Sequence, residues 1–114
     1  MDKNDAYHLL KTLDEIRLII DYSKDMSEDA LHQQPAVLDE IVFRMIQMSE
    51  HMNNVSESLK IIHPEIQWGD IKGFRNRLVH NYGNVNLNFM FTAIKVDIPK
   101  LKEDLFKVIQ ELST

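Results

Sequence analysis

Apolar residues recur every three or four positions along most of this sequence, and this spacing constrains the fold more than any other feature. A helix turns once every 3.6 residues or so, and such a repeat therefore places apolar side chains on one face that must be buried. The repeat runs through three long segments, at residues 6–20, 38–62 and 87–112, and a shorter one at 68–81. No segment shows the alternation that is typical of strands. The sequence therefore predicts an all-α protein.

Capping and helix-breaking residues indicate where these helices begin and end. Asn4 or Asp5 is a suitable N-terminal cap for the first helix, because a short polar side chain can accept a hydrogen bond from the first turn. Pro64 is expected to close the second helix. Pro99 interrupts the last repeat, and a kink or a break is expected there, because proline removes a backbone donor and clashes with the preceding turn.

The predicted connections are short. The longest polar stretch covers residues 25–35, and Gly83-Asn84 is a turn signal. Helices of similar spacing joined in this way predict an up-and-down bundle of four to five helices, in a single domain over residues 1–114. The long second stripe is rich in methionine, and it either completes the core of one chain or meets a second copy. We expect the protein to be a homodimer.

Composition excludes several classes of function. The chain has no cysteine, which rules out disulfides, thiolate zinc sites and a cysteine nucleophile. No glycine-rich phosphate loop or Gly-x-Ser-x-Gly elbow is present. Asp5-x-x-His8 and Asp29-x-x-His32 only approximate the Glu-x-x-His repeat of di-iron bundles, and we expect neither a metal nor a cofactor. With a polar N-terminus and no apolar run of about 20 residues, a cytoplasmic protein without a membrane anchor is expected.

The charge is unevenly distributed. The net charge is −5, but residues 1–57 carry −7 and residues 58–114 carry +2. The positively charged part, residues 58–114, includes four cations in or near the segment 68–81: Lys60, Lys72, Arg75 and Arg77. This pattern is either an uninformative surface or a local anion site on an acidic protein, and we favour the anion site over a broad nucleic-acid-coating surface.

The segment Arg75-Asn-Arg-Leu-Val-His80-Asn-Tyr82 is the clearest chemical signature. On a helix, Asn76 and Arg77 are neighbours of His80, while Arg75 lies about 140° around the axis from it. Arginine can stabilise charge on a phosphorane, and histidine can move the proton of a hydroxyl, a combination that suits RNA cleavage without a metal. Taken alone, the same residues are equally explained as the polar face of an amphipathic helix.

The residues that precede the signature favour the catalytic interpretation over a plain polar helix face. With the preceding Pro64-Glu-Ile-Gln-Trp68-Gly-Asp-Ile-Lys-Gly-Phe, the pattern Arg75-x4-His80-x-Tyr82 resembles the HepT-like toxins of the HEPN superfamily over almost the whole chain. The resemblance implies a dimeric helical bundle and a metal-independent endoribonuclease. Gly83 departs from the family pattern, where a bulky residue would follow the tyrosine.

The resemblance also implies a role for each motif residue. Arg75 and His80 would be catalytic, with Asn76 orienting them, and Glu50 would match an acid of the second helix in relatives. Tyr82 would accept AMP from a nucleotidyltransferase antitoxin of the MNT type, or else would serve as the last apolar anchor of its helix. The alternative function is a non-catalytic HEPN module that docks such a nucleotidyltransferase, or a nucleotide.

Overall fold

The computed structural model describes residues 3–80 and 87–112, and these residues form helices without any strand. In chain order the elements are α1 (Lys3–Ser23), α2 (Glu28–His32), α3 (Pro35–Asn53), α4 (Glu57–Ile62), α5 (Trp68–His80), α6 (Leu87–Thr92), the π-helical turn η1 (Ala93–Asp97) and α7 (Ile98–Leu112). The predicted all-α class is confirmed. Among the described residues, no helix is both long and apolar enough to span a bilayer.

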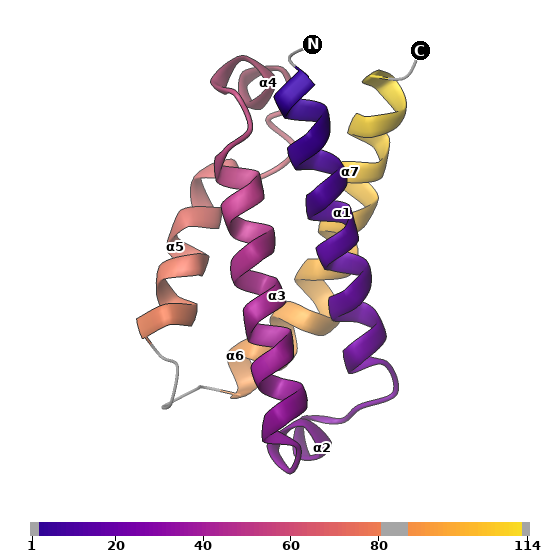
Figure 1. Cartoon of the computed structure of the whole chain (residues 1–114), viewed down its shortest axis with the longest axis vertical. Helices are drawn as coiled ribbons and strands as arrows, with labels where there is room; N and C mark the ends of the chain where they lie inside the picture. Colours follow the sequence, from indigo (N-terminus) through magenta and orange to yellow (C-terminus); the bar gives the residue numbers. More distant parts are fainter. Residues whose placement is uncertain (1–2, 81–86, 113–114) are drawn as a thin grey trace.

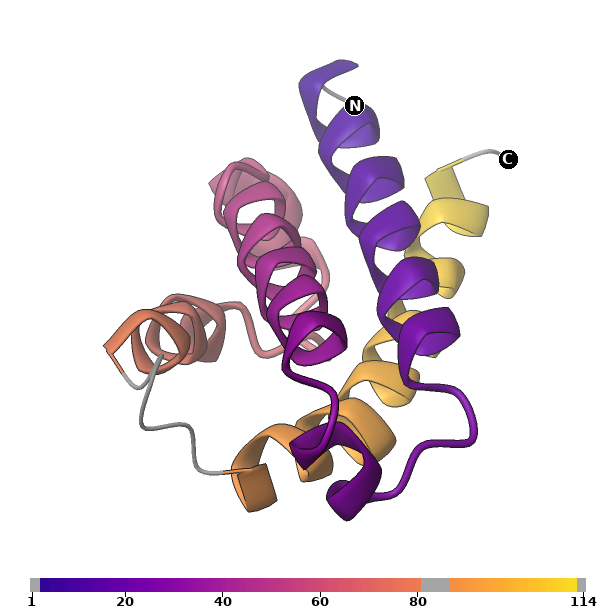
Figure 2. The same ribbon diagram turned by 60° about the horizontal axis from the view of Figure 1, so that its bottom comes forward.

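The four longest helices run alternately up and down, as the sequence predicts (Figure 1). Helix α3 lies between α1 and α5, and α7 packs against α1. The short helices α2 and α6 lie together across one end of the bundle (Figure 2). Helix α5, which carries the signature, is thus at the edge of the bundle and has α3 as its main neighbour.

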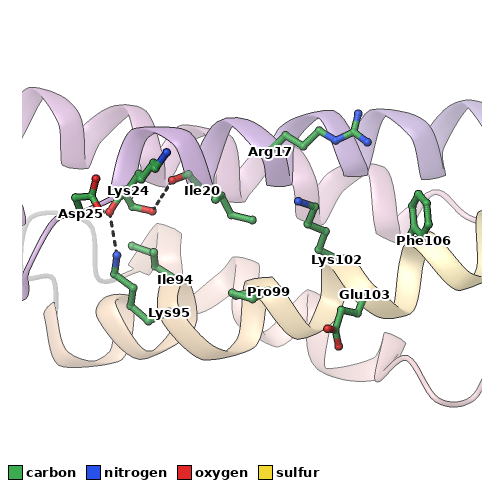
Figure 3. A pocket seen from close by; sticks show the side chains of 11 residues that line it. Arg17, Ile20, Lys24, Asp25, Ile94, Lys95, Pro99, Lys102, Glu103 and Phe106 are labelled. Atoms are coloured by element: carbon green, nitrogen blue, oxygen red, sulfur yellow. Dashed lines mark hydrogen bonds between the residues drawn. The ribbon is translucent and has the colours of Figure 1, made fainter.

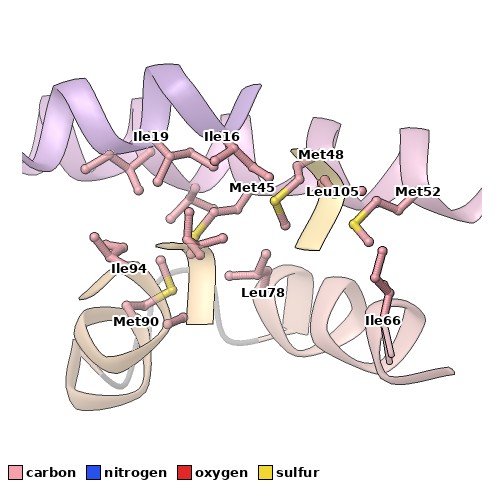
Figure 4. Packing of buried hydrophobic residues seen from close by; sticks show 14 of the residues in the cluster. Ile16, Ile19, Met45, Met48, Met52, Ile66, Leu78, Met90, Ile94 and Leu105 are labelled. Carbon is pink, nitrogen blue, oxygen red and sulfur yellow. The ribbon is translucent and has the colours of Figure 1, made fainter. Parts of the chain in front are cut away.

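One hydrophobic core joins these helices (Figure 4). Its most deeply buried large side chains are Leu9, Ile16, Ile19, Leu31, Ile41, Met45, Met48, Met52, Met90, Ile94, Leu105 and Val108. The methionine-rich stripe of α3 is therefore buried within a single chain, without contact with a second copy. Flexible methionine side chains suit this position because they fill the irregular space between helices from several directions.

The predicted continuous helix over 38–62 is wrong, because the chain breaks between α3 and α4. The break is stabilised by Asp5, whose Oδ1 accepts from the Ser56 backbone N–H (2.8 Å) and whose Oδ2 accepts from the Ser56 hydroxyl (2.6 Å). Ser56 in turn caps α4 by accepting from the Leu59 N–H. Asp5 and Asn4 lie within α1, which already includes Lys3, and the expectation that one of them caps this helix is also wrong.

The predicted interruption at Pro99 is confirmed, and it takes the form of the π-helical turn η1. The Ile98 N–H donates to the Ala93 carbonyl, five residues earlier, which is the π-helical pattern. A wider turn before Pro99 accommodates a residue that has no N–H of its own. The polar stretch 25–35, expected as a linker, contains the short helix α2, capped by Ser27.

Candidate functional site

Helix α5 begins at Trp68, whose side chain is hydrogen-bonded to the segment that precedes the helix. The Trp68 indole Nε1–H donates to the His63 carbonyl at 2.9 Å, and His63 is the C-terminal cap of α4. His63 itself is buried at this helix end. Further along α5, Leu78 is buried in the core while Ile71 and Phe74 pack against it. These three positions belong to the apolar repeat predicted at residues 68–81, and they fix which side of α5 remains exposed.

Arg75 lies on the side of α5 that meets α3. Its Nε donates to Glu50 Oε1 at 2.9 Å, in an ion pair whose side chains are 38% and 48% exposed. Its Nη1 also donates to the Asn76 side-chain oxygen at 3.4 Å. The structure thus brings together three of the predicted site residues, from two helices. A guanidinium held through Nε has N–H groups on its far edge that can contact an anion.

His80 is the last residue of α5, and its side chain is exposed. Asn76 is also exposed. Arg77 takes a different direction, because its guanidinium carbon lies 3.9 Å from the centroid of the Phe89 ring on α6. Arg77, a predicted helical neighbour of His80, thus makes a cation–π contact with another helix.

The cations that surround the signature in the sequence do not gather at one place. Lys60 lies on α4, where its Nζ donates to the Asn53 carbonyl (3.4 Å) and to Glu57 (3.5 Å). Lys72 is exposed on α5. Lys60 thus lies outside the expected local anion site, whereas Lys72 is one helical turn before Arg75 on α5.

A histidine pair on the other flank of α3 was not predicted from the sequence. His51 is half-buried, and its Nδ1 lies 3.1 Å from the Nδ1 of His8 on α1, so one ring donates and the other accepts. Burial lowers the pKa of His51, and the positive potential of His8 and Lys11 lowers it further, against an opposing effect of Glu15. The partners are 43 residues apart, and no local pattern signals the contact.

Two further predictions concern residues or ligands that the geometry does not test. Tyr82, the expected AMP acceptor, lies outside the described residues. Within residues 3–80 and 87–112, no group of three or more histidine, aspartate or glutamate side chains is arranged to hold a metal ion.

Comparison with known proteins gives several matches. The family described as "Ribonuclease HepT-like" matches residues 12–108. A Methanocaldococcus jannaschii protein named "Gamma-glutamylcyclotransferase and putative RNase" is 30% identical over 112 residues, which cover 98% of this chain and 50% of that protein. "Probable ribonuclease HepT" of Thermococcus cleftensis is 28% identical over 104 residues, covering 90% of this chain and 93% of the relative. This chain thus spans half of the first relative and nearly all of the second. No solved structure matches it.

Proposed function

This chain belongs to the HepT-like ribonuclease family of the HEPN superfamily, and from that premise we propose that it is a toxin that cleaves RNA in the cytoplasm without a metal. The observation that carries the proposal is on α5: Arg75 is oriented by Glu50, and His80 is exposed at the end of the same helix. These two residue types are sufficient for a reaction in which the substrate supplies its own nucleophile.

The proposed reaction is attack of an RNA 2′-hydroxyl on the adjacent phosphorus. As that O–P bond forms, the bond from phosphorus to the 5′-oxygen of the next nucleotide breaks. The products are a 2′,3′-cyclic phosphate and a 5′-hydroxyl, and the proton passes from the attacking to the leaving oxygen. His80 is suited to this transfer because an imidazole can accept a proton at one ring nitrogen and donate one from the other. Arg75 supplies a permanent positive charge for the phosphate oxygens.

We propose that the active form is a homodimer in which two motifs share one cleft. On one helix, Arg75 and His80 point about 140° apart, which makes a single α5 a poor site for closing around one phosphate. Two copies supply two arginines and two histidines. Val79, inside the motif, is 44% exposed, and Phe43 on α3 is 48% exposed. Apolar side chains at these positions are suited to an interface.

We further propose that Tyr82 is the point of control by an MNT-type nucleotidyltransferase antitoxin. Transfer of AMP to its hydroxyl would add bulk and negative charge two residues from His80. Both changes oppose the approach of an RNA phosphate to the motif. In this scheme the modified protein is stable but inactive.

The test is cleavage of RNA in EDTA by protein shown by mass to be free of AMP, with the product ends identified. The wild type should cleave and leave 2′,3′-cyclic phosphates. Arg75→Ala and His80→Ala should each lose about 10²-fold or more in rate. His32→Ala, which removes an exposed histidine on α2, is the matched control and should cleave normally.

Three results would contradict the proposal in whole or in part. Unchanged cleavage by His80→Ala would remove the motif from the reaction. No cleavage by the AMP-free wild type would favour the alternative, a non-catalytic HEPN module that binds a nucleotidyltransferase or a nucleotide. Sedimentation that shows a monomer at micromolar concentration would contradict the shared cleft, and with it the two-motif mechanism.

A further inference from the structure

A groove of about 760 Å³ runs between α1 and the segment η1–α7, away from the motif helix (Figure 3). Its charged side chains are Arg17, Lys24, Asp25, Lys95, Lys102 and Glu103. Four cations against two acids make it locally positive, in a protein whose net charge is −5. We call it the α1/α7 groove.

The positive charge is specific to this groove. A second hollow of about 640 Å³, between α5 and α7, has Glu65, Asp70, Asp97 and Asp104 among its lining residues, against two cations. The two hollows share α7 but present opposite charge. The cations of the α1/α7 groove are therefore not a general property of the surface.

The groove has one fixed end and one open end. At the fixed end, Lys95 of the π-helical turn donates to the Ser23 carbonyl at 2.9 Å, and this contact ties η1 to the end of α1. Asp25 follows in a left-handed conformation, with φ of 60°. Within residues 3–80 and 87–112, Arg17 and Lys102 form no ion pair, and both remain available to an external anion.

The open end combines these cations with an exposed aromatic ring. Phe106 on α7 is 48% exposed and lines the groove near Lys102 and Arg17 (Figure 3). The floor between the two ends includes Ile20 and Ile94. Cations that contact a backbone and an aromatic ring on which a base can stack are the features of surfaces that bind single-stranded nucleic acid without sequence preference.

We propose that the α1/α7 groove binds a single-stranded segment of RNA outside the cleavage site, with Arg17 and Lys102 on phosphates and Phe106 against a base. The inference rests on the proposed function, because it names a second contact for the same class of substrate. It explains how an acidic protein retains a polyanion: besides the cleavage motif, attraction is concentrated in one positively charged groove.

The test is fluorescence anisotropy with a labelled oligouridine of about 12 nucleotides, a length within the range of single-strand sites. All proteins carry His80→Ala to prevent cleavage. Adding Arg17→Glu and Lys102→Glu should weaken binding at least about tenfold and flatten the salt dependence by about 0.7 per lost phosphate contact. Phe106→Ala should weaken binding about fivefold or more with an unchanged salt dependence.

The matched control is Lys11→Glu with Lys107→Glu, which makes the same charge change on the same two helices at exposed residues outside the groove. It should bind like the parent. Equal weakening by both pairs would overturn the groove in favour of diffuse electrostatics. No effect of the groove pair would also overturn it. Thermal melting of each variant verifies folding.

Failure of this inference is separable from failure of the proposed function. If the wild type binds RNA through the groove but does not cleave it, the ribonuclease proposal fails and the groove stands. If the wild type cleaves, and the groove pair binds normally in the His80→Ala protein and cleaves normally with His80 restored, the groove fails and the ribonuclease proposal stands.

Discussion

Helices α3 and α5 lie side by side, yet they are held in the fold by different means. Helix α3 has six buried residues, Ile41, Val42, Met45, Met48, Ser49 and Met52, and contacts α1 on one flank and α5 on the other. Helix α5 has one, Leu78, and includes two glycines, Gly69 and Gly73. Apart from Leu78 and its partly buried neighbours, α5 is held by the Trp68 contact to His63 and by the ion pair of Arg75 with Glu50.

This difference indicates that α3 supplies rigidity and that α5 carries the reactive residues. Buried apolar area supplies most of the stability of a helix in a protein, and a helix with little of it opens at lower cost than its neighbours. Helix α3 therefore acts as the scaffold, and α5 as an exposed element whose motif is positioned by a side chain of the scaffold. Substitutions at the contact between the two helices, within α5 and on the far flank of α3 test this division.

Glu50→Gln should reduce the rate of RNA cleavage about tenfold, because a misdirected Arg75 places its charge poorly for the transition state. The free energy of unfolding should fall by less than about 1 kcal/mol, since the pair is partly exposed. Cleavage kinetics and urea unfolding of the same samples separate the two effects.

A second ion pair on α3 provides the control for Glu50. Glu40 accepts from Arg44 Nε at the same distance of 2.9 Å, with comparable exposure, but does not contact α5. Glu40→Gln should leave cleavage unchanged. Equal loss of rate in both variants would mean that the Glu50 effect is general to α3 and does not arise from orienting Arg75.

Gly73→Ala should stabilise the protein by about 0.5–1 kcal/mol, because alanine is the better helix former in a helix interior. A Cβ added at Gly73 meets no atom within 4 Å, and the methyl group costs no clash. Gly69→Ala, equally unobstructed but in the first turn, should stabilise less. Thermal unfolding measures both. A destabilised Gly73→Ala protein would show that α5 needs the glycine for a contact that a single chain does not make.

The limits of sequence reasoning in this protein follow from sequence separation. The span of α5 and its apolar face at Ile71, Phe74 and Leu78 follow from local spacing, and were predicted. The end of α3 was missed because it depends on a bond from Asp5 to Ser56, 51 residues away. Family resemblance singled out Glu50 and Arg75 separately, but their ion pair was not predicted, since 25 residues separate the two.

The pair of His8 and His51 lies on the flank of α3 opposite the motif. It predicts that the stability of the protein depends on pH. The pKa of His51 is lowered in the folded protein, chiefly by burial, relative to an ordinary value of 6.5. As the pH falls below about 6.5, the unfolded chain binds the proton first, and the free energy of unfolding decreases until the pH passes the lowered pKa of the folded state. The loss should be less than about 1 kcal/mol, because water screens a half-buried group.

Urea unfolding at pH 7.5 and pH 5.5 measures this loss, and His51→Gln should reduce it because glutamine does not titrate. His32→Gln, at an exposed position on α2, should retain the wild-type dependence. If cleavage by folded protein at pH 5.5 is unaffected by His51→Gln, the α1 flank of α3 contributes stability alone and the α5 flank carries the chemistry. If His51→Gln alters the pH profile of cleavage, the two flanks are coupled through α3, and the scaffold is not as independent of the motif as its burial implies.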